Sequence, residues 1–322
     1  MSAEIQYHRY VLKSRVGLNA RSERRELEGC LIRVGSGVGC IHPWVELGDE
    51  CLQGQLDALR ASKPLRLGQR ALHCARLDGQ AREQEVSLFA GLSIPDSHLT
   101  VAGDMDLNKQ DCAAFSRIKI KGAADLEKAR KKIQLCLAQV APDCLLRIDF
   151  NESLEAAVAM NLAQVLGSEI CERIEFIEDP VSYHQENWQR LRRQTGLSLA
   201  VDRDCEQGAG ERAAADWLVI KPAVVDAVLL TEQLDPEKGQ KKWLVTSYMD
   251  HAIGQMFAAY QAALLQAKYP EQLRQCGLLT HHLFERDEFF ESVQSEGPKL
   301  LVPRGTGLGF DDQLQTLPWK TL

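Results

Sequence analysis

Five segments of the chain end in charged side chains of the kinds that move protons or bind metal ions. They are RIKIKG (117–122), LLRIDFN (145–151), IEFIEDP (174–180), LSLAVDRD (197–204) and WLVIKP (217–222). Lysines at such positions are candidate acids and bases, and aspartates and glutamates are candidate ligands for a hard cation. These residues can act together only if the fold brings the ends of the segments to one place.

The same segments have the composition of buried strands, and helix-like stretches lie between the first four of them. Residues 124–140 and 153–167 carry apolar side chains at helical spacing. A strand that recurs every ~20–30 residues with amphipathic helices between predicts a parallel α/β fold. Because each strand carries its charge at its C-terminal end, where (β/α)₈ barrels hold their chemistry, we expect a TIM-like (β/α)₈ barrel.

Strand parity places several of the charged residues on shared faces. Side chains two residues apart on a strand point the same way, which pairs Lys119 with Lys121, Asp149 with Asn151, and Asp202 with Asp204. If these faces line the barrel mouth, carboxylates and lysines converge on one pocket. Carboxylates gathered out of water repel one another unless a cation lies between them. Hard oxygen ligands favour Mg²⁺, with Mn²⁺ as an alternative, and the lysines are then acid–base groups.

The motifs K-x-K, D-x-N, I-E-D-P, V-D-x-D and V-I-K-P, on the second to sixth strands, resemble those of the enolase superfamily, muconate-lactonising subgroup. Within that subgroup the short chain most resembles the o-succinylbenzoate synthase family. The resemblance implies a metal site and a catalytic pair. Its metal ligands would be Asp149, Glu178 and Asp202, and its catalytic lysines Lys121 and Lys221 on opposite sides of the substrate, with Lys119 supporting Lys121.

Two further residues of these motifs have less definite roles. Asp204 shares a strand face with Asp202 and competes with it as third ligand; strand order and the family motif favour Asp202. Asn151 is a candidate to hydrogen-bond to a metal ligand or to a water molecule.

Residues 1–95 lack the βα alternation and predict a separate α+β domain. Strands are expected at 5–12 and 26–35, and helices at 49–62 and 67–85. In the resembled family this domain caps the barrel and supplies specificity loops, so Arg21, Arg24 and Arg25 are candidates to bind a substrate carboxylate. GSGVG (35–39) is interpreted as a turn, because no helix follows to complete a nucleotide site.

The remaining barrel strands are expected at 98–103, 243–250 and 277–285, with a helix at 252–268. Thr246, Ser247 and Asp250 end the seventh strand and are candidates to bind the distal part of the substrate. Adjacent strand residues face opposite ways, so His281 and His282 are assigned structural roles. The closing segment 297–322 is expected to return to the cap, which leaves 96–296 as the barrel domain.

Composition narrows the class of protein. The 322 residues are 45% hydrophobic, enough for a barrel core and a smaller domain, and the formal net charge of −7 argues against nucleic acid or an anionic membrane as partner. Ten cysteines without a C-x-x-C pair suggest reduced thiols. With no signal-peptide pattern and no long apolar run, we expect a cytoplasmic protein that acts on a small carboxylate, as a monomer or a homo-oligomer.

The resemblance implies a Mg²⁺-dependent carbon–oxygen lyase. A proton α to a carboxylate would be removed to give an enediolate, and syn loss of water would yield o-succinylbenzoate for menaquinone synthesis. An alternative uses the same two lysines to epimerise dipeptides or racemise N-acylamino acids; Glu285 and Asp287, expected beyond the barrel mouth, favour the lyase. A second alternative is a catalytically silent metal-binding interaction protein.

Overall fold

The computed structural model describes residues 4–18, 24–102, 112–203, 205, 214–234 and 241–322. Eight parallel strands form one sheet, in the order β10-β9-β8-β7-β6-β5-β4-β11. Isolated parallel bridges, Trp243 with Leu273 and Thr246 with Gly277, join the edge strand β10 to the other edge. The sheet therefore closes into a barrel, and the predicted fold class is confirmed.

The barrel strands are short and buried, as expected for a parallel sheet that helices surround. Their bounds are β4 Ser97–Val101, β5 Arg117–Lys121, β6 Leu145–Asp149, β7 Ile174–Glu178, β8 Leu199–Val201, β9 Trp217–Ile220, β10 Lys242–Val245 and β11 Cys276–Leu279. Phe176, Ala200, Trp217, Val219 and Leu244 form a buried cluster of their own. They come from four successive strands, so side chains rather than a channel fill this part of the molecule.

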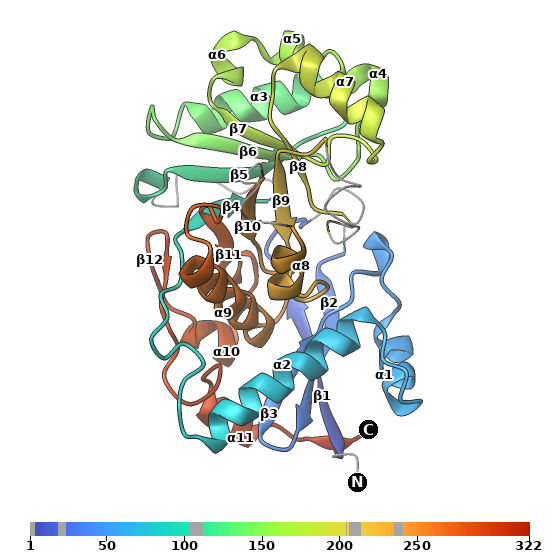
Figure 1. Ribbon diagram of the computed structural model, residues 1–322, viewed down its shortest axis with the longest axis vertical. Helices are drawn as coiled ribbons and strands as arrows, with labels where there is room; N and C mark the ends of the chain where they lie inside the picture. Colours follow the sequence, from blue (N-terminus) through green and yellow to red (C-terminus); the bar gives the residue numbers. More distant parts are fainter. Residues whose placement is uncertain (1–3, 19–23, 103–111, 204, 206–213, 235–240) are drawn as a thin grey trace.

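Helices cover the outside of the barrel (Figure 1). They are α3 Leu126–Leu137, α4 Ala156–Ala159, α5 Leu162–Leu166, α6 Ser168–Cys171, α7 Gln185–Thr195, α8 Ala227–Gln233, α9 Ala252–Lys268 and α10 Glu288–Ser292. The helix expected at 252–268 is confirmed. The single helix expected at 153–167 is wrong: the chain forms two short helices there, α4 and α5, and Gly167, at φ 83° and ψ 159°, breaks the helical path before α6.

The N-terminal part forms an antiparallel sheet with two helices, at the lower end of Figure 1. The strands are β1 Ile5–Lys13, β2 Glu26–Val34 and β3 Gly37–Ile41, and the helices are α1 Leu52–Arg60 and α2 Arg66–Glu83. A Cβ on Gly37 or Gly39 would lie 1.9 or 2.0 Å from a backbone oxygen of α2. The glycines of GSGVG thus let β3 pack against the helix, and the turn interpretation holds.

The C-terminal segment runs back along this sheet. It contains the hairpin β12 Ser295–Glu296 and β13 Lys299–Leu300, the helix α11 Asp311–Thr316, and β14 Lys320–Thr321, which pairs antiparallel with β1. Asp78 on α2 accepts the N–H of Leu308, and Gly307 bonds to the backbone at Val86 and Leu88. The division into a cap of 1–95 plus 297–322 and a barrel of 96–296 remains a prediction.

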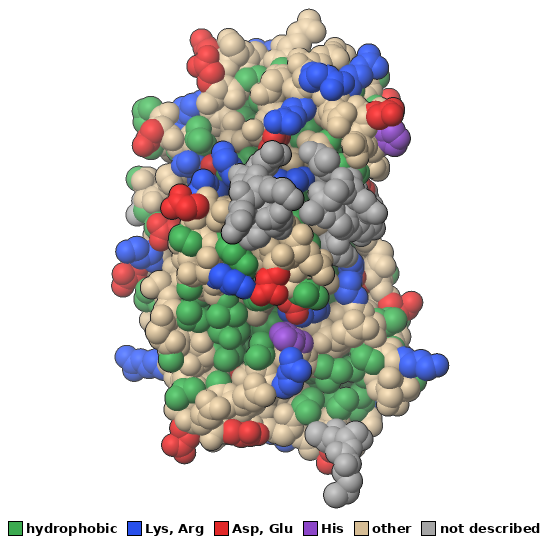
Figure 2. Space-filling view, viewed as in Figure 1, with side chains coloured by type: hydrophobic (Ala, Val, Ile, Leu, Met, Phe, Trp, Pro, Cys, Tyr) green, Lys and Arg blue, Asp and Glu red, His purple; other side chains and the backbone are tan. Residues whose placement is uncertain are grey.

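Short 3₁₀ helices at Val45–Leu47, Cys112–Ala114 and His281–Leu283 complete the described elements. None of the described helices is long and apolar enough to cross a membrane. All ten cysteines are free thiols. Positive and negative side chains are interspersed over the face shown in Figure 2.

Candidate active site

A pocket opens at the C-terminal ends of the barrel strands and contains most of the expected site residues. It encloses about 540 Å³, open mouth included. The strand ends contribute Lys119, Lys121, Asp149, Asn151 and Lys221. Leu18, Trp44 and Leu47, which precede the barrel in the chain, also line it. The wall of the pocket therefore comes from both the barrel and the N-terminal part.

Two of the lysines share one carboxylate at the ends of β5 and β6. Lys121 pairs in register with Asp149, and Asp149 with Glu178. Asp149 Oδ2 lies 2.6 Å from Lys121 Nζ and 2.9 Å from Lys119 Nζ. Lys119 Nζ also donates to both carboxylate oxygens of Glu178, at 2.7 Å each. Lys119, Lys121, Asp149 and Glu178 thus form one continuous group of ion pairs, the first lysine group. The Lys121 side chain is 14% exposed and the other three are buried.

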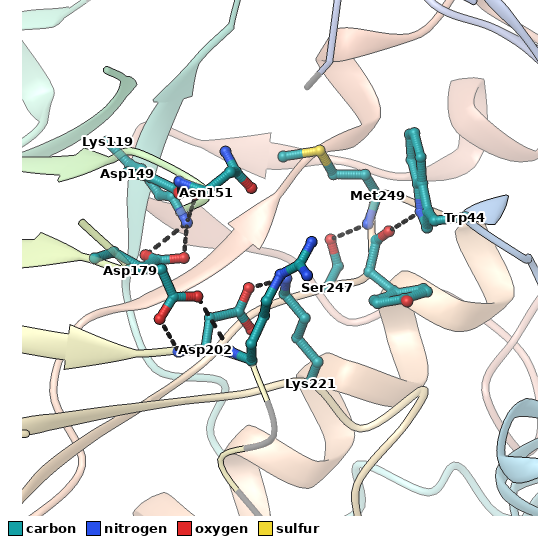
Figure 3. Close-up of polar contacts among 12 residues, drawn as sticks. Trp44, Lys119, Asp149, Asn151, Asp179, Asp202, Lys221, Ser247 and Met249 are labelled. Carbon is teal, nitrogen blue, oxygen red and sulfur yellow. Dashed lines mark hydrogen bonds and ion pairs between the residues drawn. The ribbon is translucent and has the colours of Figure 1, made fainter. Parts of the chain in front are cut away.

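The third lysine forms a second group on the neighbouring strands (Figure 3). Lys221, just after β9, makes an ion pair with Asp202, which follows β8. Its Nζ lies 5.6 Å from the ring centroid of Tyr248, a distance at which an aromatic face attracts a cation. Lys121 and Lys221 thus enter the same pocket from different strands, as the sequence predicts.

Asp179 holds the backbone beside this second group. Its carboxylate accepts the N–H of Asp202 at 3.2 Å and of Arg203 at 3.1 Å. Asp179 has φ 39°, an uncommon conformation for a residue with a side chain. The aspartate lies inside the I-E-D-P motif, but the sequence analysis assigned it no role. Its neighbours Asp202 and Arg203 are distant in the chain, so only the fold reveals the contact.

Burial and mutual repulsion perturb these carboxyl groups. Burial, with the charge of Asp149, raises the pKa of Glu178 to about 7. Burial and Asp202 raise the pKa of Asp179 well above its ordinary value. Burial acts the same way on Asp149, but Lys119 and Lys121 outweigh it and hold that pKa far below the usual range. Asp149 is therefore balanced by two lysines, whereas burial makes the charged forms of Glu178 and Asp179 unfavourable.

The donor set fits a divalent cation by its chemistry. Asp149 and Glu178 are hard oxygen ligands with almost no exposure, and a buried carboxylate needs a positive partner to stay charged. In this structure, however, both carboxylates form ion pairs with lysines. Within the described ranges, no three Asp, Glu, His or Cys side chains are grouped closely enough to hold a metal. The assignment of Asp149, Glu178 and Asp202 as metal ligands stays a prediction.

The expected substrate contacts fall into two sets. Asn151, Thr246 and Ser247 line the pocket, and Ser247 Oγ lies 2.6 Å from Thr280 Oγ1. Arg25 is instead exposed and donates to the backbone oxygen of Arg15 at 2.6 Å.

The other candidates also lie apart from the lysines. Arg24 pairs with Glu46 at 3.0 Å. Asp250 is buried, and Asp287 caps α10. Arg21 and Asp204 are outside the described residues.

Several residues that line the pocket escaped the sequence analysis, among them Trp44, Tyr248 and His98. Trp44 donates its Nε1–H to the backbone oxygen of Tyr248 at 2.8 Å, and Figure 3 shows it opposite the lysines, next to Met249. Tyr248 in turn donates its hydroxyl to Asp49 at 2.9 Å. His98, on β4, also lines the pocket. In the sequence, only the position of Trp44 next to Pro43 could have suggested that this side chain lines the pocket.

Known proteins are similar to this chain in sequence and in fold. Residues 5–81 match the family model "O-succinylbenzoate synthase, N-terminal domain", and residues 106–218 match "Enolase C-terminal domain-like". The o-succinylbenzoate synthase of Bdellovibrio bacteriovorus is 31% identical, over 99% of this chain and 98% of that protein.

Solved structures agree on the fold. A dipeptide epimerase from Enterococcus faecalis complexed with Mg and L-Leu-L-Tyr superposes with a TM-score of 0.75 at 17% identity, covering 96% of this chain and 99% of that one. The muconate lactonizing enzyme of Pseudomonas fluorescens gives 0.76 at 17% identity, covering 98% and 100%. The chain therefore belongs to the enolase superfamily and, within it, to the o-succinylbenzoate synthase family.

Proposed function

We propose that the protein is a Mg²⁺-dependent hydro-lyase that makes o-succinylbenzoate from a succinyl-substituted hydroxycyclohexadiene carboxylate. The observation that carries this proposal is the placement of Lys121 and Lys221 in one pocket, at the ends of β5 and β9, beside a cluster of buried carboxylates. Membership of the family gives the substrate class. A role in menaquinone synthesis in the cytoplasm follows from the same proposal.

Lys121 is the proposed acid–base residue. Its Nζ removes the proton α to the substrate carboxylate and then, as an ammonium, delivers that proton to the β-hydroxyl on the same face. The electron pair of the broken C–H bond forms the new double bond as the C–O bond breaks, water leaves, and the ring becomes aromatic.

Lys221 is the proposed electrostatic partner. Its ammonium, held by Asp202, stabilises the negative charge that develops on the substrate carboxylate after deprotonation. Asp149, Glu178 and Asp202 would hold Mg²⁺, which when bound stabilises that same charge, as is general for enolase-superfamily sites. Each contribution is larger after deprotonation than before it, and such a difference accelerates the reaction.

A second function uses the same lysines. In a dipeptide epimerase or N-acylamino acid racemase, Lys121 and Lys221 would each exchange the α-proton, from opposite faces. The fold shared with dipeptide epimerases supports this alternative. The full-length match to an o-succinylbenzoate synthase favours the lyase.

Ultraviolet-monitored conversion of the hydroxycyclohexadiene acid to its aromatic product tests the proposal directly. We expect conversion with Mg²⁺ and its loss with EDTA. Lys121→Ala should abolish turnover, whereas Lys221→Arg, which keeps a positive charge, should retain some. Lys13→Ala is the control, because Lys13 is exposed and does not line the pocket. Equal retention in the Lys121 and Lys221 variants would rule out the one-base scheme.

Solvent deuterium separates the two functions. Incorporation of deuterium at the α-carbon of an N-succinyl amino acid or a dipeptide, with no conversion of the cyclohexadiene acid, would favour the epimerase.

A further inference from the structure

His98 on β4 faces a buried arginine inside the barrel. Its Nδ1 lies 2.7 Å from NH1 of Arg147, whose side chain is also fully buried. Arg147 is fixed on its other sides, because Nε donates to Glu175 at 2.6 Å and NH1 also donates to the backbone oxygen of Gln275 at 2.7 Å. Its guanidinium lies 5.1 Å from the ring centroid of Phe176. The arginine is therefore held in one orientation.

This contact determines which nitrogen of His98 carries the proton. A guanidinium has only donors and keeps its charge in proteins, so His98 Nδ1 must accept the bond and the proton must be on Nε2. Burial, with the positive charges of Arg147 and Lys119, lowers the pKa of His98 well below its ordinary value. The imidazole is neutral, and its Nε2–H is a donor.

The Nε2 edge of the ring lies on the pocket side. A Cβ added to Gly277 would lie 2.8 Å from Nε2 and 2.7 Å from Cε1, and both Gly277 and His98 line the pocket. Thr246, only 5% exposed, also lines the pocket, and its hydroxyl is buried with no hydrogen-bond partner in the part of the chain that the structure describes. A Cβ on Gly277 would also lie 2.7 Å from Cγ2 of Thr246, so the Thr246 side chain and the Nε2 edge of His98 face the same glycine.

A hydroxyl this deeply buried is rarely left without a partner, so a ligand group that reaches it would also meet the Nε2–H of His98. The surrounding charge selects the partner: Arg147 and Arg117 share the single carboxylate of Glu175, which leaves net positive charge behind the imidazole. An anionic oxygen is the best match to a neutral donor in such a field.

We propose that His98 Nε2–H, with the Thr246 hydroxyl beside it, binds a carboxylate oxygen of the substrate's side chain, away from the reacting carbon. The inference rests on the proposed function, because it assumes that a substrate with a second acidic arm enters this pocket. It makes His98 a specificity residue: the ring carboxylate lies near the lysines, and the succinyl carboxylate reaches the inner wall.

Nitrogen NMR of protein labelled with ¹⁵N-histidine tests this without turnover. We expect His98 to show a protonated Nε2 and an unprotonated Nδ1 in the free protein. With Mg²⁺ and saturating o-succinylbenzoate, the Nε2 resonance should shift; benzoate, which lacks the succinyl arm, should leave it in place. His282, whose Nε2 lies 3.0 Å from the backbone oxygen of Thr100, is the internal control.

A protonated Nδ1 in His98, or an Nε2 resonance that o-succinylbenzoate does not move, would overturn the inference whether or not conversion occurs. Equal shifts of the Nε2 resonance with o-succinylbenzoate and with benzoate would also overturn it, because the succinyl arm would then make no contact with His98. Absence of conversion by the unmodified enzyme would count against the proposed function alone.

Variants give an independent readout. His98→Leu removes a hydrogen bond to a charged group, so KM for the succinyl substrate should rise about 10- to 100-fold, with a much smaller change in kcat. His98→Gln, which keeps an N–H donor, should restore part of the affinity. His73→Gln on α2, outside the pocket, is the control. An unchanged KM in His98→Leu would contradict the proposal.

Discussion

Replacing Lys119 by methionine should destabilise the metal-free protein and strengthen its response to Mg²⁺. Lys119 is 5% exposed, and its Nζ is within 3 Å of both Asp149 and Glu178. Methionine fills a similar volume and has no charge. The variant therefore leaves two buried carboxylates with less positive charge, while little of the packing changes.

The size of the effect follows from burial. Removal of one partner from a buried ion pair lowers the free energy of unfolding by about 3–5 kcal/mol. With an unfolding entropy of roughly 2.1 cal/mol/K per residue, 322 residues give a fall in Tm of about 4–7 °C. The lost positive charge also favours a cation at the same oxygens. Each tenfold gain in Mg²⁺ affinity adds about 1.4 kcal/mol at saturating metal, or roughly 2 °C.

Thermal unfolding in EDTA and in MgCl₂ measures both parts. The matched control is Lys13→Met, because Lys13 pairs with Glu26 at 3.4 Å and both side chains are more than half exposed. A pair of that kind contributes at most about 1 kcal/mol. The reasoning is refuted if the two variants lose equal stability in EDTA, or if Mg²⁺ raises the Tm of Lys119→Met no more than that of the unmodified protein.

Three further predictions concern carboxylates outside the first lysine group. Burial raises the pKa of Asp250 from 3.8 to about 7; the folded state then holds its proton more tightly than the unfolded state, and stability falls by up to roughly 4 kcal/mol as pH rises from 4 to 7. Asp250→Asn should remove that fall. The prediction is wrong if denaturant titrations from pH 4.5 to 8 show a constant difference in the free energy of unfolding between the variant and the unmodified protein. Asp179→Asn keeps one of two acceptors for backbone N–H groups and tolerates the positive φ, so we expect kcat to drop about tenfold with a smaller change in KM; unchanged kinetics would remove Asp179 from the site. Arg82→Met leaves the fully buried Asp78 side chain without its ion pair, so amides of 304–314 should lose hydrogen-exchange protection while β5 and β6 keep theirs; equal loss in all of them would show that cap and barrel unfold as one unit.

The sequence predicts the barrel well because its signals are local. An apolar run that ends in a charged residue marks a strand end, and a continuous helical pattern, as in α9, marks a helix. The pattern at 153–167 has the same periodicity, but the segment forms the short helices α4 and α5 and not one continuous helix. Hydrophobic periodicity predicts which face of a segment is apolar, but it does not predict whether one helix or several short helices form that face.

The sequence predicts the site less completely, because several of its residues act through distant neighbours. Lys121 and Asp149 are on adjacent strands at the same register, so their motifs suffice to place them together. His98 acts through Arg147, which is 49 residues away and is itself held by Glu175. Trp44 reaches the pocket only because the N-terminal part packs across the barrel mouth. No motif encodes such contacts.

The lysines of the pocket have two incompatible tasks, and the geometry shows how both can be met. Without a cation, the buried carboxylates need counter-charges, and Lys119 and Lys121 supply them by sharing Asp149 Oδ2. With its Nζ 2.6 Å from Asp149 Oδ2, Lys121 is directed at a carboxylate and not at the space that a substrate would occupy. To reach substrate, the Lys121 side chain must leave Asp149. If Asp149 binds Mg²⁺ as proposed, the metal would take the place of Lys121 at this carboxylate and free the lysine for substrate. The proposal thus gives one reason for the paired positions of Lys121 and Asp149 on neighbouring strands.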